Sequence, residues 1–194
     1  MSTASVTSRP GAVLADLLPA SRTKDIALVV GGAALTGIAA QIAVPVPGSP
    51  VPVSGQTFAA LLVGTALGAR RGFLSLALYA VVGMAGMPWF AQGASGYAMP
   101  SFGYILGMVL AATAVGALAR RGADRSVLRT AGVMAAGSVI IYAVGVPYLA
   151  LATGMTLSQA VAAGLTPFLI GDALKAALAM GALPTAWKLV GRRG

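Results

Sequence analysis

The sequence predicts an all-α membrane protein with six transmembrane helices in one domain and both termini in the cytoplasm. Three observations lead to this fold class. First, 58% of the 194 residues are hydrophobic and only 9% are charged, against roughly 25% charged residues in ordinary soluble domains. Second, six apolar segments follow one another along the chain, and none shows the strict alternation that a transmembrane β-barrel requires. Third, basic residues gather in every second connection, as the positive-inside rule expects.

The chain is expected to divide into a cytoplasmic N-terminal tail, residues 1–24, and a transmembrane domain, residues 25–190. The tail is rich in Ser and Thr and then weakly amphipathic, so it is either disordered or carries a short surface helix. It lacks the pattern of a signal peptide. The predicted membrane segments are about 26–44, 56–69, 72–90, 101–119, 131–151 and 165–187. A spanning helix needs roughly 20 apolar residues, so the second segment is expected to be half-length, tilted or buried against its neighbours.

Lysine and arginine residues indicate the orientation of the six segments. They lie before the first segment, between the second and third, between the fourth and fifth, and after the sixth: Arg22, Lys24, Arg70, Arg71, Arg120, Arg121, Arg125, Arg129, Lys188, Arg192 and Arg193. The other three connections carry no charged residue. This alternation predicts a multi-pass protein of the cell membrane. The net charge of +9 is therefore a topology signal with some attraction to anionic lipid, and not a nucleic-acid-binding surface, because it lies in short loops without interleaved aromatic residues.

The uncharged outer connections are unusual in composition. The first contains four prolines, which exclude a helix and favour an extended path: Pro45, Pro47, Pro50 and Pro52. The second reads "PWFAQGASGYAMPSFGY" and combines glycines, which allow close approach of the backbone to a ligand, with Trp89, Phe90, Tyr97 and Tyr104 as flat walls and hydroxyl donors. Both connections are either plain surface loops or, as we expect, fold inward over a cavity near the outer leaflet.

Asp172 and Lys175 are the two charged residues that fall within a predicted membrane segment. Their spacing places both on one face of a helix, at ion-pair distance. A charge at the middle of a membrane costs on the order of 3 kcal/mol or more, and two apolar residues would avoid that cost. We therefore expect a ligand site in the outer half, about 7 Å along the helix from Pro167, in which Asp172 accepts N–H groups and Lys175 donates to a carbonyl or carboxylate. The alternative is a purely structural ion pair.

The residue types in the chain exclude several kinds of chemistry. Cysteine and histidine are both absent, which excludes disulfides, Cys or His metal ligands and Cys/His nucleophilic catalysis. A Walker motif is also absent, so the chain cannot hydrolyse nucleotide itself. We expect no enzymatic activity, no cofactor and no metal, and instead the capture of a small, mostly uncharged molecule with a polar head. A small intramembrane enzyme that uses Asp172 and Lys175, and a structural membrane scaffold, remain as alternatives.

Three stretches of the sequence together resemble the BioY family, the biotin-specific S components of energy-coupling factor (ECF) transporters. They are "VPVSGQTFAALLVGTALGARRGFLSLALYAVVGMAGMPWFAQG", "PSFGYILG" and "IGDALKAALA". The resemblance runs from about residue 26 to 186. It implies six helices, an outward-open pocket for biotin, and a first loop with Pro47, Gly48 and Pro50 that acts as a lid. It also implies three partners: a transmembrane coupling protein and two ATP-binding-cassette ATPases. An S component for another vitamin is the alternative within this class.

The resemblance also implies site residues. In the family's "G-D-x-x-K" segment, Asp172 and Lys175 bind the polar groups of biotin. The full expected ligand set is Asp172, Lys175, Gln92, Tyr104, Ser101, Gly103, Phe90 and Trp89. Gln92 takes the place of an asparagine-like ligand, since the chain has no asparagine, and an arginine ligand of some relatives has no match in the outer half. The first helix is expected to meet the coupling protein through Ala33 and Gly37, with Ala27 and Gly31, or else to use these small residues for packing within the chain.

Overall fold

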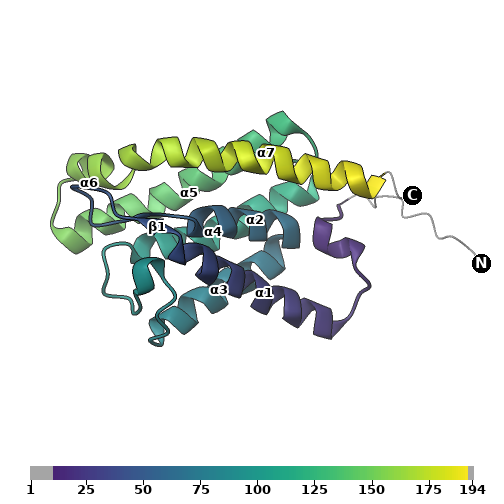
Figure 1. Cartoon of the computed structure of the whole chain (residues 1–194), viewed down its shortest axis with the longest axis horizontal. Coiled ribbons are helices and arrows are strands. Elements are labelled where there is room, and N and C mark those ends of the chain that lie inside the picture. The colour runs from purple at the N-terminus through teal and green to yellow at the C-terminus, as the bar shows by residue number, and fades with distance from the viewer. Residues whose placement is uncertain (1–10, 192–194) are drawn as a thin grey trace, which may run out of the picture.

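Residues 11–191 of the chain, described by a computed structural model, fold into a bundle of six helices of 12 residues or more, with one short helix and a small hairpin at one end (Figure 1). The long helices are α1 Arg22–Gln41, α2 Gln56–Leu67, α3 Ala69–Met84, α4 Phe102–Arg120, α5 Val127–Thr153 and α7 Leu169–Gly191. The smaller elements are α6 Leu157–Gly164, the 3₁₀ turns η1 Leu14–Leu17, η2 Ala91–Gly93 and η3 Thr166–Phe168, and the strands β1 Ala43–Val44 and β2 Val53–Ser54.

The predicted all-α architecture of six long helices is confirmed. Within the described residues, four helical stretches are long and apolar enough to cross a membrane: α1, α4, α5 and the stretch Leu157–Val190, which contains α7. The second segment is short, as expected, with 12 residues in α2. The third differs from the prediction, since α3 ends at Met84 instead of near residue 90. Gly86, with φ of 107°, follows the C-cap, and Pro88 prevents the helix from resuming.

The connection at about 152–164, expected as a loop, contains the short helix α6. Its N-terminus is fixed by a capping box. The Gln159 amide donates to the Thr156 hydroxyl at 3.3 Å, and the Thr156 amide donates to the Gln159 side-chain oxygen at 2.9 Å. The sixth predicted segment accordingly begins with η3, and α7 starts only at Leu169.

Helix α4 forms the centre of the bundle and packs against α2, α3 and α5. Glycines at the crossings bring the helix backbones close together. A Cβ atom added to Gly107 would lie 2.8 Å from the carbonyl oxygen of Ile141 on α5, and one added to Gly72 would lie 2.8 Å from the Cα of Gly64 on α2. Such contacts are typical of membrane helices. The hydrophobic effect does not drive their association within lipid, so close van der Waals packing at small residues takes its place.

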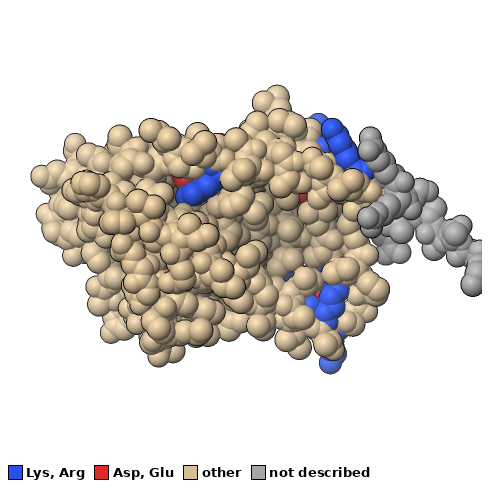
Figure 2. All heavy atoms as spheres, in the orientation of Figure 1, with Lys and Arg blue, Asp and Glu red and all other residues tan. Residues whose placement is uncertain are grey.

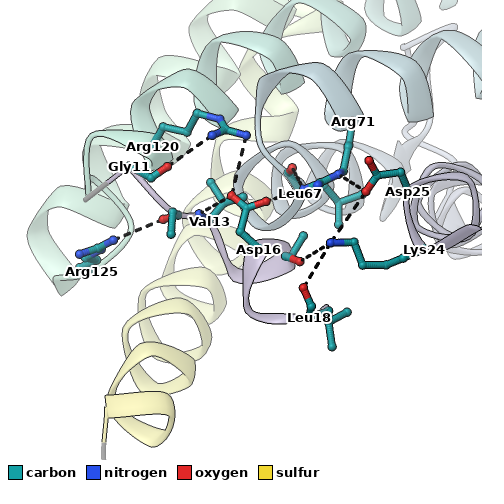
Figure 3. A network of polar contacts seen from close by, with 12 residues as sticks. Gly11, Val13, Asp16, Leu18, Lys24, Asp25, Leu67, Arg71, Arg120 and Arg125 are labelled. Atoms are coloured by element: carbon teal, nitrogen blue, oxygen red, sulfur yellow. Dashed lines mark hydrogen bonds and ion pairs between the residues drawn. The ribbon is translucent and has the colours of Figure 1, made fainter. Parts of the chain in front are cut away.

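The start of α1, the α2–α3 junction, the end of α4 and the end of α7 lie together at what we call the basic end of the molecule (Figure 1). Most of the basic side chains visible in Figure 2 gather there. In Figure 3, Arg71 contacts two carboxylates, at 2.8 Å for Asp16 and 2.9 Å for Asp25, and Arg120 lies 3.8 Å from Asp16. Arginines from α3 and α4 therefore hold the N-terminal segment against the bundle.

The described part of the N-terminal tail is ordered on the bundle rather than disordered. Val13 and Ala15 are buried, and they pack against Ala119 of α4. The turn η1 takes the place of the short surface helix that the sequence allowed. The rest of the predicted tail, residues 1–10, lies outside the described residues.

The first connection is extended, as its prolines predict. Ala43 pairs with Ser54 and Val44 with Val53 in a two-stranded antiparallel ladder. The tip of this hairpin, residues 45–52, reaches toward α6 at the end of the molecule opposite the basic end (Figure 1).

Candidate functional site

Asp172 and Lys175 form an ion pair in the first turns of α7. The Lys175 ammonium lies 3.3 Å from Asp172 Oδ1, and both side chains are largely buried, with 18% and 17% of their surface exposed. In Figure 2 basic and acidic atoms also lie together on the surface away from the basic end. The predicted geometry of this pair, on one helix face and within ion-pair distance, is confirmed.

Two side chains from other helices complete a polar chain. Lys175 donates to the Thr57 hydroxyl on α2 at 2.8 Å. The Tyr142 hydroxyl on α5 donates to Asp172 Oδ2. Sequence reasoning missed both, because Thr57 and Tyr142 lie 118 and 30 residues from their partners. Their only sequence signal is a hydroxyl within an apolar segment, which is also common at positions of simple packing.

An apolar cavity of about 690 Å³ lies beside Asp172, within the range of about 300–1,000 Å³ that is usual for small-molecule sites. Its polar walls are Ser138, Tyr142 and Asp172. The remaining lining is aliphatic and comes from α5, α6, the residue that follows α6, and α7: Ala131, Met134, Ala135, Val139, Ala143, Val146, Pro147, Leu157, Val161, Leu165, Leu169, Ala173 and Ala176. A second, small space of about 10 Å³ also borders Asp172 and is lined by Thr57, Ser138, Lys175 and apolar side chains. Asp172 thus borders both the cavity and this small space.

The hairpin lies next to this site. A Cβ atom on Gly171 would be 3.6 Å from a methyl group of Val53 on β2. At the hairpin tip, Gly48 faces α6 residues Gln159 and Ala162 across a groove of about 340 Å³. Pro47, Gly48 and Pro50 are themselves exposed. Of the predicted lid residues, Gly48 therefore borders α6, and Val53 of the same hairpin contacts Gly171, the residue before Asp172.

Trp89 and Phe90 do not border the cavity and instead pack α3 against α1. The Trp89 indole donates to the Tyr79 carbonyl at 3.0 Å, and its ring lies 2.9 Å from the place of a Cβ on Gly37. Phe90 is 1% exposed and fills the space at Gly83. The structure therefore gives both aromatic rings a packing role, in place of the ligand-wall role that the sequence led us to expect.

Gln92 lies in η2, which packs beside α1. Its side chain is exposed, and its φ of 61° is the one positive value among the described non-glycine residues. The structure does not bring Gln92 to the cavity that Asp172 borders. A shift of the loop would be needed before Gln92 could share a ligand with the ion pair.

The "P-S-F-G-Y" segment lies close to the site but does not line the cavity. The Tyr104 hydroxyl donates to the Gly164 carbonyl at 2.8 Å, and its ring meets the edge of Tyr142 at 6.3 Å between centroids. Gly103 admits the Tyr148 side chain of α5, so its missing Cβ serves helix packing rather than a ligand. Ser101 precedes α4 and is half-buried.

The structure corrects the predicted partner-facing residues of α1. Ala33 and Gly37 are buried within the chain, with Gly37 against Trp89, so they offer no surface to another protein. Ala27 and Gly31 are exposed, and a Cβ on Gly31 would meet no atom within 4 Å. Ala33 and Gly37 therefore serve packing within the chain, whereas Ala27 and Gly31 do not.

Comparison with known proteins agrees with this architecture. The sequence model of the BioY family matches residues 9–192. The chain belongs to the BioY family. Relatives in this family include a probable biotin transporter BioY of Pyrococcus horikoshii, 35% identical over 82% of this chain and 93% of that protein, and biotin transporter BioY2 of Lactococcus lactis, 33% identical over 79% and 84%.

A solved structure shares the fold. It is the crystal structure of the S-component for biotin from an ECF-type ABC transporter, which superposes with a TM-score of 0.78 at 20% identity and covers 88% of this chain and 95% of that one. BioY membership, together with four helical stretches among residues 11–191 that are long and apolar enough to cross a membrane, makes the chain a multi-pass membrane protein.

Proposed function

We propose that the chain is the membrane-embedded, high-affinity biotin-binding subunit of an ECF transporter and mediates biotin uptake. Its BioY relatives are named as biotin transporters, and the matching fold is that of a biotin S-component. The observation that carries the proposal is the ion pair of Asp172 and Lys175, joined to Tyr142 and Thr57 beside an apolar cavity.

The donors and acceptors that remain free on Lys175 and Asp172 match the hydrogen-bonding pattern of a urea group. An ammonium has three N–H donors, and Lys175 gives two of them to Asp172 and Thr57. An ionised carboxylate accepts at about four positions, and Lys175 and Tyr142 fill two on Asp172. One donor and further acceptor positions are left. The ureido ring of biotin presents one carbonyl oxygen and N–H groups, which is the complementary pattern.

The apolar lining suits the sulfur-containing ring of biotin and the methylene groups of its side chain, which offer no strong hydrogen-bonding group. The side chain ends in a carboxylate, which the aliphatic walls would not bind. Burial of the apolar groups contributes roughly 25 cal/mol per Å². The aliphatic walls of the cavity would therefore supply affinity, while Asp172 and Lys175 would supply orientation and specificity.

The proposal places the protein in the cytoplasmic membrane with the basic end inside the cell. The site then opens toward the outer side, with the β1–β2 hairpin as its lid. Energy comes from partners, a transmembrane coupling protein and two ATP-binding-cassette ATPases, since the chain has no nucleotide-binding motif of its own. The exposed side of α1 around Ala27 and Gly31 would meet the coupling protein.

The test is equilibrium binding of biotin to the purified chain in detergent, with Lys175→Ala and Lys188→Ala beside it. Lys188 lies at the basic end of α7, so it is a matched control. A hydrogen bond to a charged group contributes about 1.5–3 kcal/mol. We therefore expect saturable binding that weakens about 10- to 100-fold in Lys175→Ala and is unchanged in Lys188→Ala.

Two results would count against the proposal. A folded wild type that binds no biotin would redirect the site to another vitamin. Loss of the fold in Lys175→Ala, with biotin binding absent from the wild type, would support a structural ion pair.

A further inference from the structure

We infer that Tyr142 and Thr57 are positioning residues of the ligand site. They fix Asp172 and Lys175 in the orientation that forms hydrogen bonds with a urea group. The inference rests on the proposed function. It concerns two residues that neither the sequence nor the comparisons point to. The two hydroxyls lie at opposite ends of one hydrogen-bonded chain, Thr57–Lys175–Asp172–Tyr142, which joins α2, α7 and α5.

Tyr142 fixes the plane of the Asp172 carboxylate. The terminal torsion of an aspartate is broad and has no strong preference of its own. Here the two oxygens are held by different donors, Oδ1 by Lys175 and Oδ2 by Tyr142. Rotation of the carboxylate would break one contact or the other, so the remaining acceptor positions keep a constant direction.

Tyr142 is itself held in place by its neighbours. Its ring meets Tyr104 edge-on, with an interplanar angle of 86°. Tyr104 is in turn tied to Gly164 by its hydroxyl and stacked on Phe168 at 6.5 Å. The Tyr142 hydroxyl is thus positioned by α4 and by the α6–η3 corner, while one side of the residue borders the cavity.

Thr57 does the same for Lys175. A lysine side chain carries about 2 kcal/mol of rotamer entropy on a flexible stem. The contact of 2.8 Å with the Thr57 hydroxyl restricts that freedom before a ligand arrives. Thr57 lies in the first turn of α2, three residues after β2 ends. The anchor of the lysine is therefore continuous in the chain with the hairpin that borders the site.

A double-mutant cycle tests whether Tyr142 acts through Asp172. Biotin affinity is measured for the wild type, Tyr142→Phe, Asp172→Asn and the double variant, up to millimolar biotin so that weak binding stays measurable. We expect Tyr142→Phe to weaken binding about 10-fold in the wild-type background and less than about 3-fold once Asp172 is changed. Tyr148→Phe is the control, because that hydroxyl donates to the Tyr97 carbonyl at 3.0 Å, away from the ion pair.

Equal losses in both backgrounds would overturn the inference for Tyr142, since the hydroxyl would then act independently of Asp172. Thr57→Val with Lys175→Met forms a second cycle with the same expectation, and it decides the question if Tyr142→Phe does not fold. Failure of the wild type to bind biotin would overturn the proposed function and this inference with it. Normal wild-type binding with additive losses in both cycles would overturn the inference alone.

Discussion

At the scale of single residues, Asp124 is the one charged residue among the described residues that is fully buried, and it has a partner on another element. It lies in the α4–α5 connection and accepts the Trp187 indole N–H at 2.7 Å. The guanidinium of Arg125 lies 4.5 Å from the centre of the same ring. Trp187 therefore contacts both Asp124 and Arg125 at the basic end. The Trp187 side chain is only 8% exposed.

Asp124 gives a prediction about pH. Burial raises its pKa, against the lowering effects of the Trp187 hydrogen bond and of Arg125. Because the folded state binds the proton more tightly than the unfolded state, this group stabilises the fold at low pH, and that contribution is lost as the pH rises through the folded pKa. Asp124→Asn keeps an acceptor for Trp187 and removes the buried charge. We expect its melting temperature at pH 7 to equal or exceed that of the wild type and to depend less on pH.

A paired variant provides the control. Asp124→Leu removes the acceptor as well and leaves the indole N–H unsatisfied, at a cost of about 1–3 kcal/mol. Thermal unfolding of both variants in detergent, between pH 5 and pH 8, separates the two effects. A strongly destabilised Asp124→Asn would show that the negative charge itself is needed.

At the residue scale the sequence was sufficient to predict the ion pair of Asp172 and Lys175, because two opposite charges in an apolar segment are costly and therefore conspicuous. It was insufficient to predict the contacts of Thr57 and Tyr142, whose hydroxyls find their partners only across helices. It was misleading for Trp89 and Phe90, since aromatic residues in an outer connection suit a ligand wall and a packing cluster equally well.

At the scale of elements, the crossing of α2, α3 and α4 depends on glycine. A Cβ atom on Gly116 would collide with the backbone nitrogen of Ala69 and lie 2.6 Å from the carbonyl carbon of Gly68. We expect Gly116→Ala to destabilise the fold by about 1–3 kcal/mol, because backbone rather than a flexible side chain must move. Gly132→Ala on α5 is the control, since its added methyl group meets nothing within 4 Å.

Thermal unfolding of the two variants measures this difference. Equal stability of Gly116→Ala and wild type would mean that the three helices can separate without cost. Gly132→Ala should be neutral or slightly stabilising, as alanine is the better helix former.

Hydropathy predicted the positions of the long helices well but placed some of their ends wrongly. Residues 85–90 are apolar, so hydropathy extends the predicted third segment to residue 90. Gly86 and Pro88 nevertheless end α3 early, and the Trp89 ring packs against α1. Helix α6 was missed, although Thr156 and Gln159 form a capping box that is legible in the sequence. Charge-free residues between two long segments were taken for a loop, and local capping was the stronger signal.

At the scale of the whole molecule, the basic end lies opposite the end that carries α6 and the tip of the hairpin (Figure 1). The proposed orientation places residues 49, 95 and 158 outside the cell and residue 126 inside. The chain has no cysteine, so single-cysteine variants of these four serines report their location directly. We expect a membrane-impermeant maleimide to label Ser49→Cys, Ser95→Cys and Ser158→Cys in intact cells, and Ser126→Cys only after lysis. The reverse pattern would invert the topology.

The central claim, that Asp172 and Lys175 bind the ureido group of biotin, is tested most directly by a crystal structure of the chain with biotin. The account predicts that the ureido carbonyl accepts from Lys175 and that a ureido N–H donates to Asp172, each at about 2.7–3.2 Å, with Tyr142 and Thr57 still in contact with the pair. Biotin bound elsewhere in the chain, with the ion pair unchanged and out of its reach, would contradict the account.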